Sequence, residues 1–421
     1  MRVLFTTFAA KSHLYDMVPL AWALHTAGHE VRVASQPDLA EDITRASLTA
    51  VPVGEELNLD QVLQEDTSDE DPSLADLDIA ENRPEMLTWD YVLRVFQWYS
   101  PVMFEGLAGE AVMDDIVEFA REWRPDLVIW DPMTFSGPVA ARASGAAHAR
   151  MLFGQDFIGR MRGHFMRLKL QQQPGNQQDP MAEWLDATMK RFNSSFAEEM
   201  VVGQWSIDST PAWMRLPLDI NYVPVRFVPY HGPVAVPEWL SERPARPRVC
   251  LTAGISGREV MGGDWVPIPQ MLEAVADLDI DVVATLDASQ LEAVKAIPDN
   301  VQLFDFFPLN VLMPTCSAVI HHGGAGAFGT ALANAVPQLI IPNHIWDTVV
   351  KAEQFAERGA GLFLDPEGLT TDTLRSKLLR LLEDPSFADG AAQARDDFLA
   401  TPSPNDIVPV LEELTAKHRV R

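Results

Sequence analysis

The chain has 421 residues, enough for two or three domains, and 47% of them are hydrophobic, which excludes a chain that is disordered throughout. Its 32 basic and 60 acidic residues give a formal net charge of −28, so nucleic-acid binding is not expected. Two cysteines exclude a disulfide framework, and because we find neither a signal-peptide pattern nor an apolar stretch long enough to span a membrane, we expect a cytoplasmic protein.

The first half of the chain alternates strands and helices. Residues 2–7 form a β-rich run, and a helix with apolar residues at helical spacing follows and ends at Gly28. The pattern then predicts strands at 30–35, 126–131 and 149–153, and a helix at 138–144. Strand–helix–strand units of this kind are typical of a parallel α/β sheet.

An acidic segment interrupts this half. Residues 54–85 carry twelve acidic side chains against one basic side chain, Arg83, and few aromatic residues. Such a composition buries little apolar surface, so we interpret the segment as a mobile, solvated loop, with a partner-binding role as the alternative.

Residues 232–248 contain four prolines and show no periodicity, which indicates a linker. Beyond it, we expect strands at 249–252, 281–286, 301–304, 318–320 and 338–341, and helices near 271–275, 290–297, 327–335, 348–357 and 374–382. The prediction is an α/β protein with two Rossmann-like domains, residues 1–231 and 249–421, facing across a ligand-binding cleft. The last helix is a candidate to pack back on the N-terminal domain.

The densest motif is His321-His322-Gly-Gly-Ala-Gly, between a predicted strand and a predicted helix. Gly324, Gly326 and Gly329 match the G-x-G-x-x-G dinucleotide fingerprint, but the motif lies far into its domain, so an NAD-dependent dehydrogenase is only an alternative. Small residues before a helix let a phosphate approach its N–H groups, and His322 adds a hydrogen-bond donor. A structural role for His322 is the competing interpretation.

His13 follows the first strand, and Asp131 ends the strand at 126–131, so both are expected at the same rim of the sheet. A neutral imidazole there can act as a general base, and a carboxylate bonded to it fixes its tautomer. The alternatives are a histidine at a helix N-terminus and an aspartate that caps the turn before Pro132. No histidine–carboxylate spacing indicates a zinc site.

Three phenylalanines, Phe304, Phe306 and Phe307, are expected to pack in the core with their strand. The turn Phe307-Pro308 follows the strand end, where its backbone is able to hydrogen-bond the edge of a base.

Taken together, these residues resemble nucleotide-sugar glycosyltransferases of the GT-B fold. The resemblance is carried by His13, the proline-rich linker, the His-His-Gly-Gly turn, Trp346-Asp347-Thr348, and segments such as FTTFAAKSH, RPDLVIWDP and VVGQWSID. It covers essentially the whole chain and is closest to actinobacterial enzymes that transfer TDP-deoxysugars to polyketide aglycones (anthracyclines or macrolides) in antibiotic biosynthesis.

The resemblance implies roles for the matching positions: His13 as catalytic base and Asp131 as its orienting partner; Ser256, His322, Gly324 and Gly326 for the diphosphate; Phe307 and Pro308 beside the thymine; Asp347 and Thr348 for the sugar hydroxyls. There are two departures from the family pattern. Ala327 and Phe328 stand where many relatives have Ser or Thr, so one hydroxyl contact to the diphosphate is expected to be missing. Thr348 replaces the commoner glutamine, which suits a sugar with fewer hydroxyls.

The resemblance also implies an inverting transfer of a deoxysugar, in particular an aminodeoxysugar, with no metal and no other cofactor. The implied protein partners are an auxiliary activator, a heme-less cytochrome-like homologue docking near residues 54–120, and a second copy of the chain. The acceptor pocket is expected in the N-terminal half, where residues 89–98 either wall it or pack in the core. A catalytically inactive, glycosyltransferase-like binding protein is the competing function.

Overall fold

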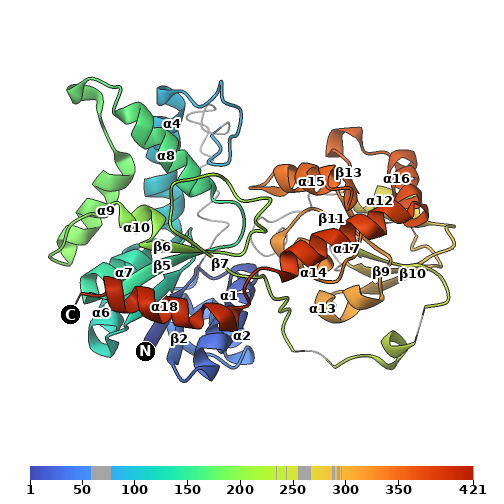
Figure 1. The fold of residues 1–421 in the computed structure, drawn as a ribbon, viewed down its shortest axis with the longest axis horizontal. Coiled ribbons are helices and arrows are strands. Elements are labelled where there is room, and N and C mark those ends of the chain that lie inside the picture. Colours follow the sequence, from blue (N-terminus) through green and yellow to red (C-terminus); the bar gives the residue numbers. More distant parts are fainter. Residues whose placement is uncertain are drawn as a thin grey trace. The chain divides into compact units, whose positions relative to one another are not determined.

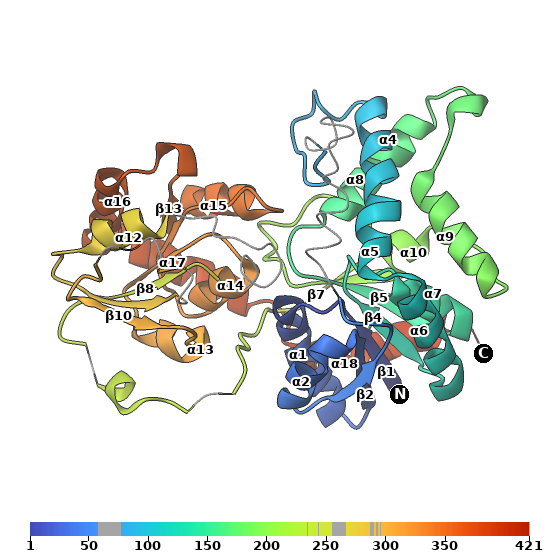
Figure 2. The ribbon, with the colours of Figure 1, turned by 180° about the vertical axis from the view of Figure 1, so that it is seen from behind.

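The structure is a computed structural model that describes residues 1–57, 77–233, 235–242, 244–254, 267–286, 290–291, 294 and 296–420. The chain forms two compact units: Met1–Thr210 with Arg215–Val225 and Pro402–Arg421, and Pro211–Met214 with Arg226–Thr401. Each unit contains one parallel sheet with helices packed against it (Figures 1 and 2). The predicted α/β class with two Rossmann-like domains is therefore confirmed.

The first unit has a seven-stranded sheet. Its strands are β1 (Arg2–Thr6), β2 (Glu30–Ser35), β3 (Thr49–Pro52), β4 (Leu127–Trp130), β5 (Ala147–Leu152), β6 (Trp205–Asp208) and β7 (Tyr222–Pro224). Its helices are α1 (Lys11–Thr26), η1 (Pro37–Leu39), α2 (Ala40–Arg45), α4 (Trp89–Trp98), the π-helix η3 (Tyr99–Phe104), α5 (Glu105–Leu107), α6 (Glu110–Trp123), α7 (Ser136–Ser144), α8 (Phe157–Lys169), η4 (Pro174–Asn176), α9 (Pro180–Arg191), α10 (Glu199–Val202) and α18 (Pro404–His418). The strand order is β3-β2-β1-β4-β5-β6-β7, with every pairing parallel.

The second unit has a six-stranded sheet. Its strands are β8 (Arg248–Thr252), β9 (Asp281–Thr285), β10 (Val301–Phe304), β11 (Ala318–His321), β12 (Gln338–Ile340) and β13 (Gly361–Phe363). Its helices are η5 (Glu238–Ser241), α12 (Ile268–Val275), α13 (Leu309–Leu312), η6 (Met313–Thr315), α14 (Ala325–Ala333), α15 (Thr348–Glu357), η7 (Pro366–Gly368), α16 (Thr371–Glu383) and α17 (Pro385–Leu399). The order is β10-β9-β8-β11-β12-β13, again parallel throughout.

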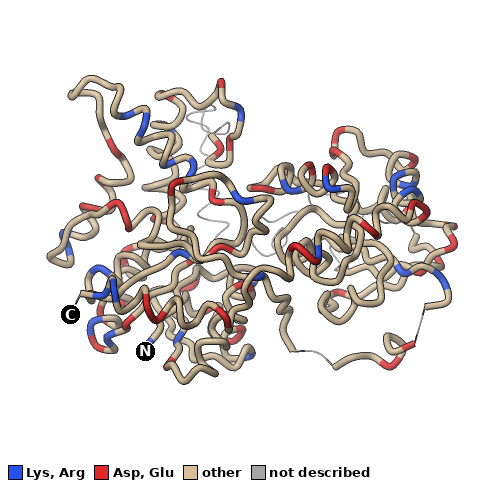
Figure 3. The backbone as a smooth tube through the Cα atoms, in the orientation of Figure 1, with Lys and Arg blue, Asp and Glu red and all other residues tan. Residues whose placement is uncertain are grey.

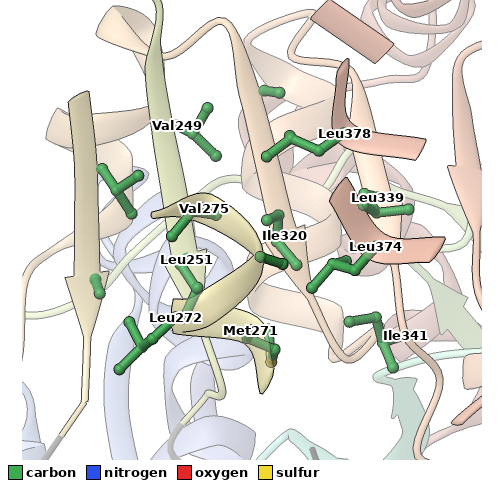
Figure 4. Close-up of a cluster of buried hydrophobic side chains, with 14 of the residues drawn as sticks. Val249, Leu251, Met271, Leu272, Val275, Ile320, Leu339, Ile341, Leu374 and Leu378 are labelled. Atoms are coloured by element: carbon green, nitrogen blue, oxygen red, sulfur yellow. The ribbon is translucent and has the colours of Figure 1, made fainter. Parts of the chain in front are cut away.

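The side chains of the second sheet alternate between its two faces, and helices cover each face, so both faces are buried. Val249 and Leu251 of β8 point toward α12 and α16, as Figure 4 shows. Cys250 points to the opposite face and packs in a cluster with residues of α13 and α14. Phe307 joins that second cluster, whereas Phe306 is 48% exposed, so the prediction of a core position is wrong for Phe306. The reason is that β10 ends at Phe304, and the side chains beyond it no longer alternate across the sheet.

Some segments differ from the sequence-based expectation. The described residues of 290–297 form no helix, and the others of that range lie outside the described residues. Helix α14 begins at Ala325, two residues earlier than expected, and α16 is followed by α17 and α18. Of these, α16 belongs to the second unit, whereas α18 belongs to the first, where it packs against α1 and β5. Residues 232–248 lie in the second unit, and Leu240 of η5 is buried there.

Part of the acidic segment is packed within the first unit. Ile79 and Ala80 are buried, and Arg160 of α8 donates hydrogen bonds to the backbone carbonyls of Ala80 and Glu81, at 2.8 Å and 2.7 Å. For residues 77–81 the expectation of a solvated loop is therefore wrong. Residues 58–76 of the segment lie outside the described residues.

Charged side chains occur on both units, with acidic residues along many elements of each (Figure 3). The net charge of −28 is thus not confined to the acidic segment, and any anion site needs local hydrogen-bond donors. Within the described parts of the chain, no helix is long and apolar enough to cross a membrane.

Candidate functional site

The predicted site residues lie at corresponding places in the two sheets. In the first sheet the strand order reverses between β1 and β4, and in the second it reverses between β8 and β11. Open α/β sheets bind ligands beyond the carboxyl ends of the strands at such switch points. His13 and Asp131 follow β1 and β4, and His322 follows β11.

His13 and Asp131 form a hydrogen-bonded pair. Nδ1 of His13 lies 2.6 Å from Oδ2 of Asp131, so its N–H donates to the carboxylate and Nε2 is the ring nitrogen able to take up a proton. The other carboxylate oxygen of Asp131 accepts the backbone N–H of Met133 at 2.9 Å. Asp131 therefore both orients the imidazole of His13 and caps its own turn. These are the two roles that the sequence offered as alternatives.

The surroundings of His13 favour proton uptake. Burial alone would lower the pKa of His13, but the negative charge of Asp131 and its hydrogen bond, helped by Asp16, outweigh burial and raise the pKa above its ordinary value. The rings of Phe8 and Phe153 lie 4.5 Å and 4.6 Å from the imidazole, centroid to centroid. They restrict the access of water to the pair while leaving the His13 side chain 17% exposed.

The turn after β11 is held by His321. Nδ1 of His321 accepts the N–H of Gly323 at 3.0 Å, so its Nε2–H donates to Oε1 of Gln338, which lies 2.7 Å away. Gly323 has a φ of +95°, which residues with a side chain rarely adopt. His321 is fully buried and occupied, and we conclude that it shapes the turn.

His322 lies between two glycines, and its buried Nδ1 is unsatisfied within the described part of the chain. A Cβ atom on Gly254 would lie 2.4 Å from Cε1 of His322, and one on Gly324 would lie 2.7 Å from Nε2, so glycine is needed at both positions. Nδ1 is buried and has no hydrogen-bond partner among the described residues. Burial, with the positive charge of Lys351, lowers the pKa of His322 to about 4, so the ring is neutral at pH 7.

Helix α14 begins directly after this turn. Gly324 is its N-cap and makes no side-chain capping bond, and the first N–H groups of a helix have no partner within the helix. Such N–H groups and the helix dipole bind anions. The neutral imidazole of His322 lies beside them, with Nε2 as the ring atom nearest Gly324, so the turn has the features of an anion site.

The predicted sugar-binding residues lie beside the same turn. Asp347 is buried and pairs with Lys351, Oδ1 to Nζ at 2.8 Å. Lys351 also donates to the backbone carbonyl of Gly323 at 3.0 Å. Thr348 is buried, and its hydroxyl has no hydrogen-bond partner in the described part of the chain. Sequence reasoning missed Lys351, although its i, i+4 spacing from Asp347 on a predicted helix was a usable signal.

Other predicted residues are placed differently. Phe307 is 5% exposed and packs against Trp239 and Phe304, so little of its side chain is open to a ligand. Ser256 lies outside the described residues. Of the expected acceptor wall, Val95 and Phe96 are fully buried in the core.

The chain matches two family models, erythromycin biosynthesis protein CIII-like N-terminal domain over residues 22–254 and the corresponding C-terminal domain over 269–414. Aclacinomycin-T 2-deoxy-L-fucose transferase of Streptomyces galilaeus is 55% identical over 100% of this chain and 97% of its own length. 10-Deoxymethynolide desosaminyltransferase of Streptomyces venezuelae is 48% identical over 100% and 98%. The crystal structure of glycosyltransferase VinC in complex with dTDP has a TM-score of 0.90 and 45% identity, covering 99% of this chain and all of that one.

Proposed function

This chain belongs to the erythromycin biosynthesis protein CIII-like family and is a GT-B glycosyltransferase, and from this premise we propose that it transfers a deoxysugar from a TDP-sugar to a hydroxyl group of a polyketide aglycone, an anthracycline or a macrolide. The predicted family, fold and enzyme class are confirmed, and the dehydrogenase alternative is wrong. The observation that carries the proposal is the His13–Asp131 pair, because a protein that only binds has no need of an oriented base.

In the proposed reaction, Nε2 of His13 takes the proton of the acceptor hydroxyl as its oxygen attacks the anomeric carbon. The bond between that carbon and the diphosphate oxygen breaks in the same step, and TDP leaves with the electron pair. A single displacement inverts the configuration at the anomeric carbon. General base catalysis of this kind contributes about 10²–10⁴-fold to a rate.

The donor site stabilises the leaving group without a metal in this proposal. The N–H groups of the first turn of α14, with Gly324 and Gly326, and the neutral ring of His322 supply hydrogen bonds where negative charge grows on the diphosphate. Asp347 and Thr348 contact the sugar, and Ser256 joins the diphosphate contacts by resemblance to the family. The buried, unsatisfied Nδ1 of His322 supports this assignment.

We also propose that the donor sugar is an aminodeoxysugar, that an auxiliary activator protein raises the turnover, and that the chain forms a homodimer. The relatives named above transfer different sugars, so the donor is tested with the TDP forms of 2-deoxyfucose and desosamine in competition. Turnover that rises sharply when a heme-less cytochrome-like helper is added would support the partner, and full activity of the chain alone would contradict it.

The deciding experiment compares the wild-type chain with the His13→Ala variant. Product formation is followed by mass spectrometry, its anomeric configuration by NMR, and TDP affinity by calorimetry. We expect the wild type to form an inverted glycoside, and the variant to lose at least about 10²-fold in turnover with TDP affinity unchanged. Most of the turnover surviving in the variant would refute the base assignment. A wild type that binds TDP and transfers nothing, with or without helper, would favour the binding-protein alternative.

A further inference from the structure

A second histidine lies against the first turns of α14. Nε2 of His231 is 3.4 Å from Oγ1 of Thr330 and would lie 3.8 Å from a Cβ atom on Gly326. The hydroxyl of Thr330 donates to the carbonyl of Gly326 at 2.6 Å, so its oxygen is an acceptor toward His231. His231, Gly326 and Thr330 all belong to the second unit. The imidazole therefore lies beside the helix turn that carries the proposed diphosphate contacts.

The contact with Thr330 uses only one nitrogen of this ring. Nδ1 of His231 is buried and has no hydrogen-bond partner among the described residues. Nδ1 of His322, a residue that is more than nine-tenths buried, is in the same state; it lies on the side of Gly254, and Nε2 is the ring atom nearest Gly324. Both rings present Nε2 to a glycine at the start of α14 and hold a buried Nδ1 that no described residue satisfies. Buried polar atoms in folded proteins are nearly always satisfied, so two such imidazoles beside one helix N-terminus point to a ligand with several acceptor atoms.

The chemistry of this helix turn fits a diphosphate. Gly326 has open space around its Cα atom, where, among the described residues, only His231 comes within 4 Å of an added Cβ. Ala327, the next residue of this turn, has no hydroxyl to offer a ligand. From these contacts we infer that His231 binds the diphosphate of the TDP donor together with His322, in place of the hydroxyl that Ala327 lacks. This inference rests on the proposed function and adds a residue to its donor site.

His231 can donate a hydrogen bond to the ligand at a small cost in free energy. At 3.4 Å its contact with Thr330 is long for a hydrogen bond, so little is lost when the ring proton moves from Nε2 to Nδ1. Burial lowers the pKa of His231 to about 4, so the ring is neutral at pH 7, and none of the described residues forms an ion pair with it. A diphosphate beside Nδ1 favours the tautomer that donates from this nitrogen.

The test is calorimetric binding of TDP and of thymidine to the full-length wild type, His231→Ala and His231→Asn. His25→Ala is the matched control, because His25 is an exposed histidine of α1 in the first unit. We expect His231→Ala to weaken TDP binding about tenfold or more and to leave thymidine binding within about twofold, the size of effect for one hydrogen bond to an anion. His231→Asn, whose amide retains a donor, should lose less, and His25→Ala should bind both ligands as the wild type does.

The thermal unfolding of each variant shows whether it is folded, and His231→Asn serves the test if His231→Ala is not. An unchanged TDP dissociation constant in a folded variant would overturn the inference. An equal loss of thymidine affinity would also overturn it, because it would assign His231 a structural role. If the wild type binds neither TDP nor thymidine, the proposed function itself fails, and this result is distinct from the other two.

Discussion

Replacing Lys351 by methionine tests the buried charge pair beside the donor turn. The side chains of Lys351 and Asp347 are both 5% exposed, and their charged atoms lie 2.8 Å apart. Lys351→Met removes the ammonium from beside the Asp347 carboxylate and also from the carbonyl of Gly323. Breaking a buried pair on one side costs about 3–5 kcal/mol, because a charge is left in a low-dielectric site. In a domain of this size that loss lowers the unfolding temperature by roughly 6–20 °C.

The control is an exposed pair with the same spacing. Lys190 and Asp186 are also four residues apart on a helix, at 2.7 Å, but their side chains are 72% and 34% exposed. Lys190→Met should change the free energy of unfolding by only about 0.3–0.5 kcal/mol. Urea unfolding followed by circular dichroism measures both variants. If Lys351→Met loses no more stability than Lys190→Met, burial does not make the Lys351–Asp347 pair more costly to break than an exposed pair.

A double variant separates lost charge compensation from lost packing. Asp347→Asn with Lys351→Met removes both charges and keeps the volume of both side chains nearly unchanged. We expect it to recover most of the stability that Lys351→Met loses. A double variant as unstable as the single one would instead assign the effect to packing against Phe328, whose ring centroid lies 5.4 Å from the lysine Nζ.

Three further predictions concern the reaction. The rate should fall as the pH drops through the pKa of His13, which lies above its ordinary value, because the base must be neutral to take up a proton. Asp131→Asn removes the charge that raises this pKa, so the acid limb of the kcat/KM profile should move to lower pH and the plateau should fall. EDTA should leave TDP binding and turnover unchanged, since N–H groups and neutral imidazole are the proposed anion donors; activity lost to EDTA and restored by magnesium would contradict this. His322→Ala should weaken TDP binding about tenfold in calorimetry, and an unchanged dissociation constant would make His322 structural.

The elements that the sequence predicted well are those with a clear period and a clear end. Helix α15 was predicted with the observed bounds, Thr348–Glu357, and strand β10 likewise, Val301–Phe304. Four short strands, β3, β6, β7 and β13, were missed, because three or four residues show little alternation; β12 is as short but lies in the run 338–341, which was predicted. Helix α18 was missed although Ser403, Pro404 and Asp406 form a capping box with proline at the first helical position, a signal that the sequence did contain.

The site was predictable where topology alone brings residues together. The carboxyl ends of parallel strands meet at one edge of a sheet, which is why His13 and Asp131 were expected at one rim although 118 positions separate them. The contacts of His231 and Phe153 were not predictable in this way, because they depend on how loops fold back onto a helix or ring. Phe307 lies in the core as its strand context predicts, and the position beside the thymine that the family resemblance implies for it stays a prediction.

The two central histidines show how the same side chain is given different tasks. A carboxylate 2.6 Å from His13 raises its pKa, so its ring gains a proton readily while Asp131 compensates the new charge. Burial and the cation of Lys351 lower the pKa of His322, so its ring stays neutral, and in the proposed reaction it donates a hydrogen bond. In that proposal a neutral donor site binds the diphosphate through fixed dipoles, and the charge that grows on departing TDP strengthens these bonds in the transition state. Exchanging the two environments would disable both roles. The base must be able to take up a proton near neutral pH, whereas the residue that donates a hydrogen bond to the diphosphate must do so while it stays neutral.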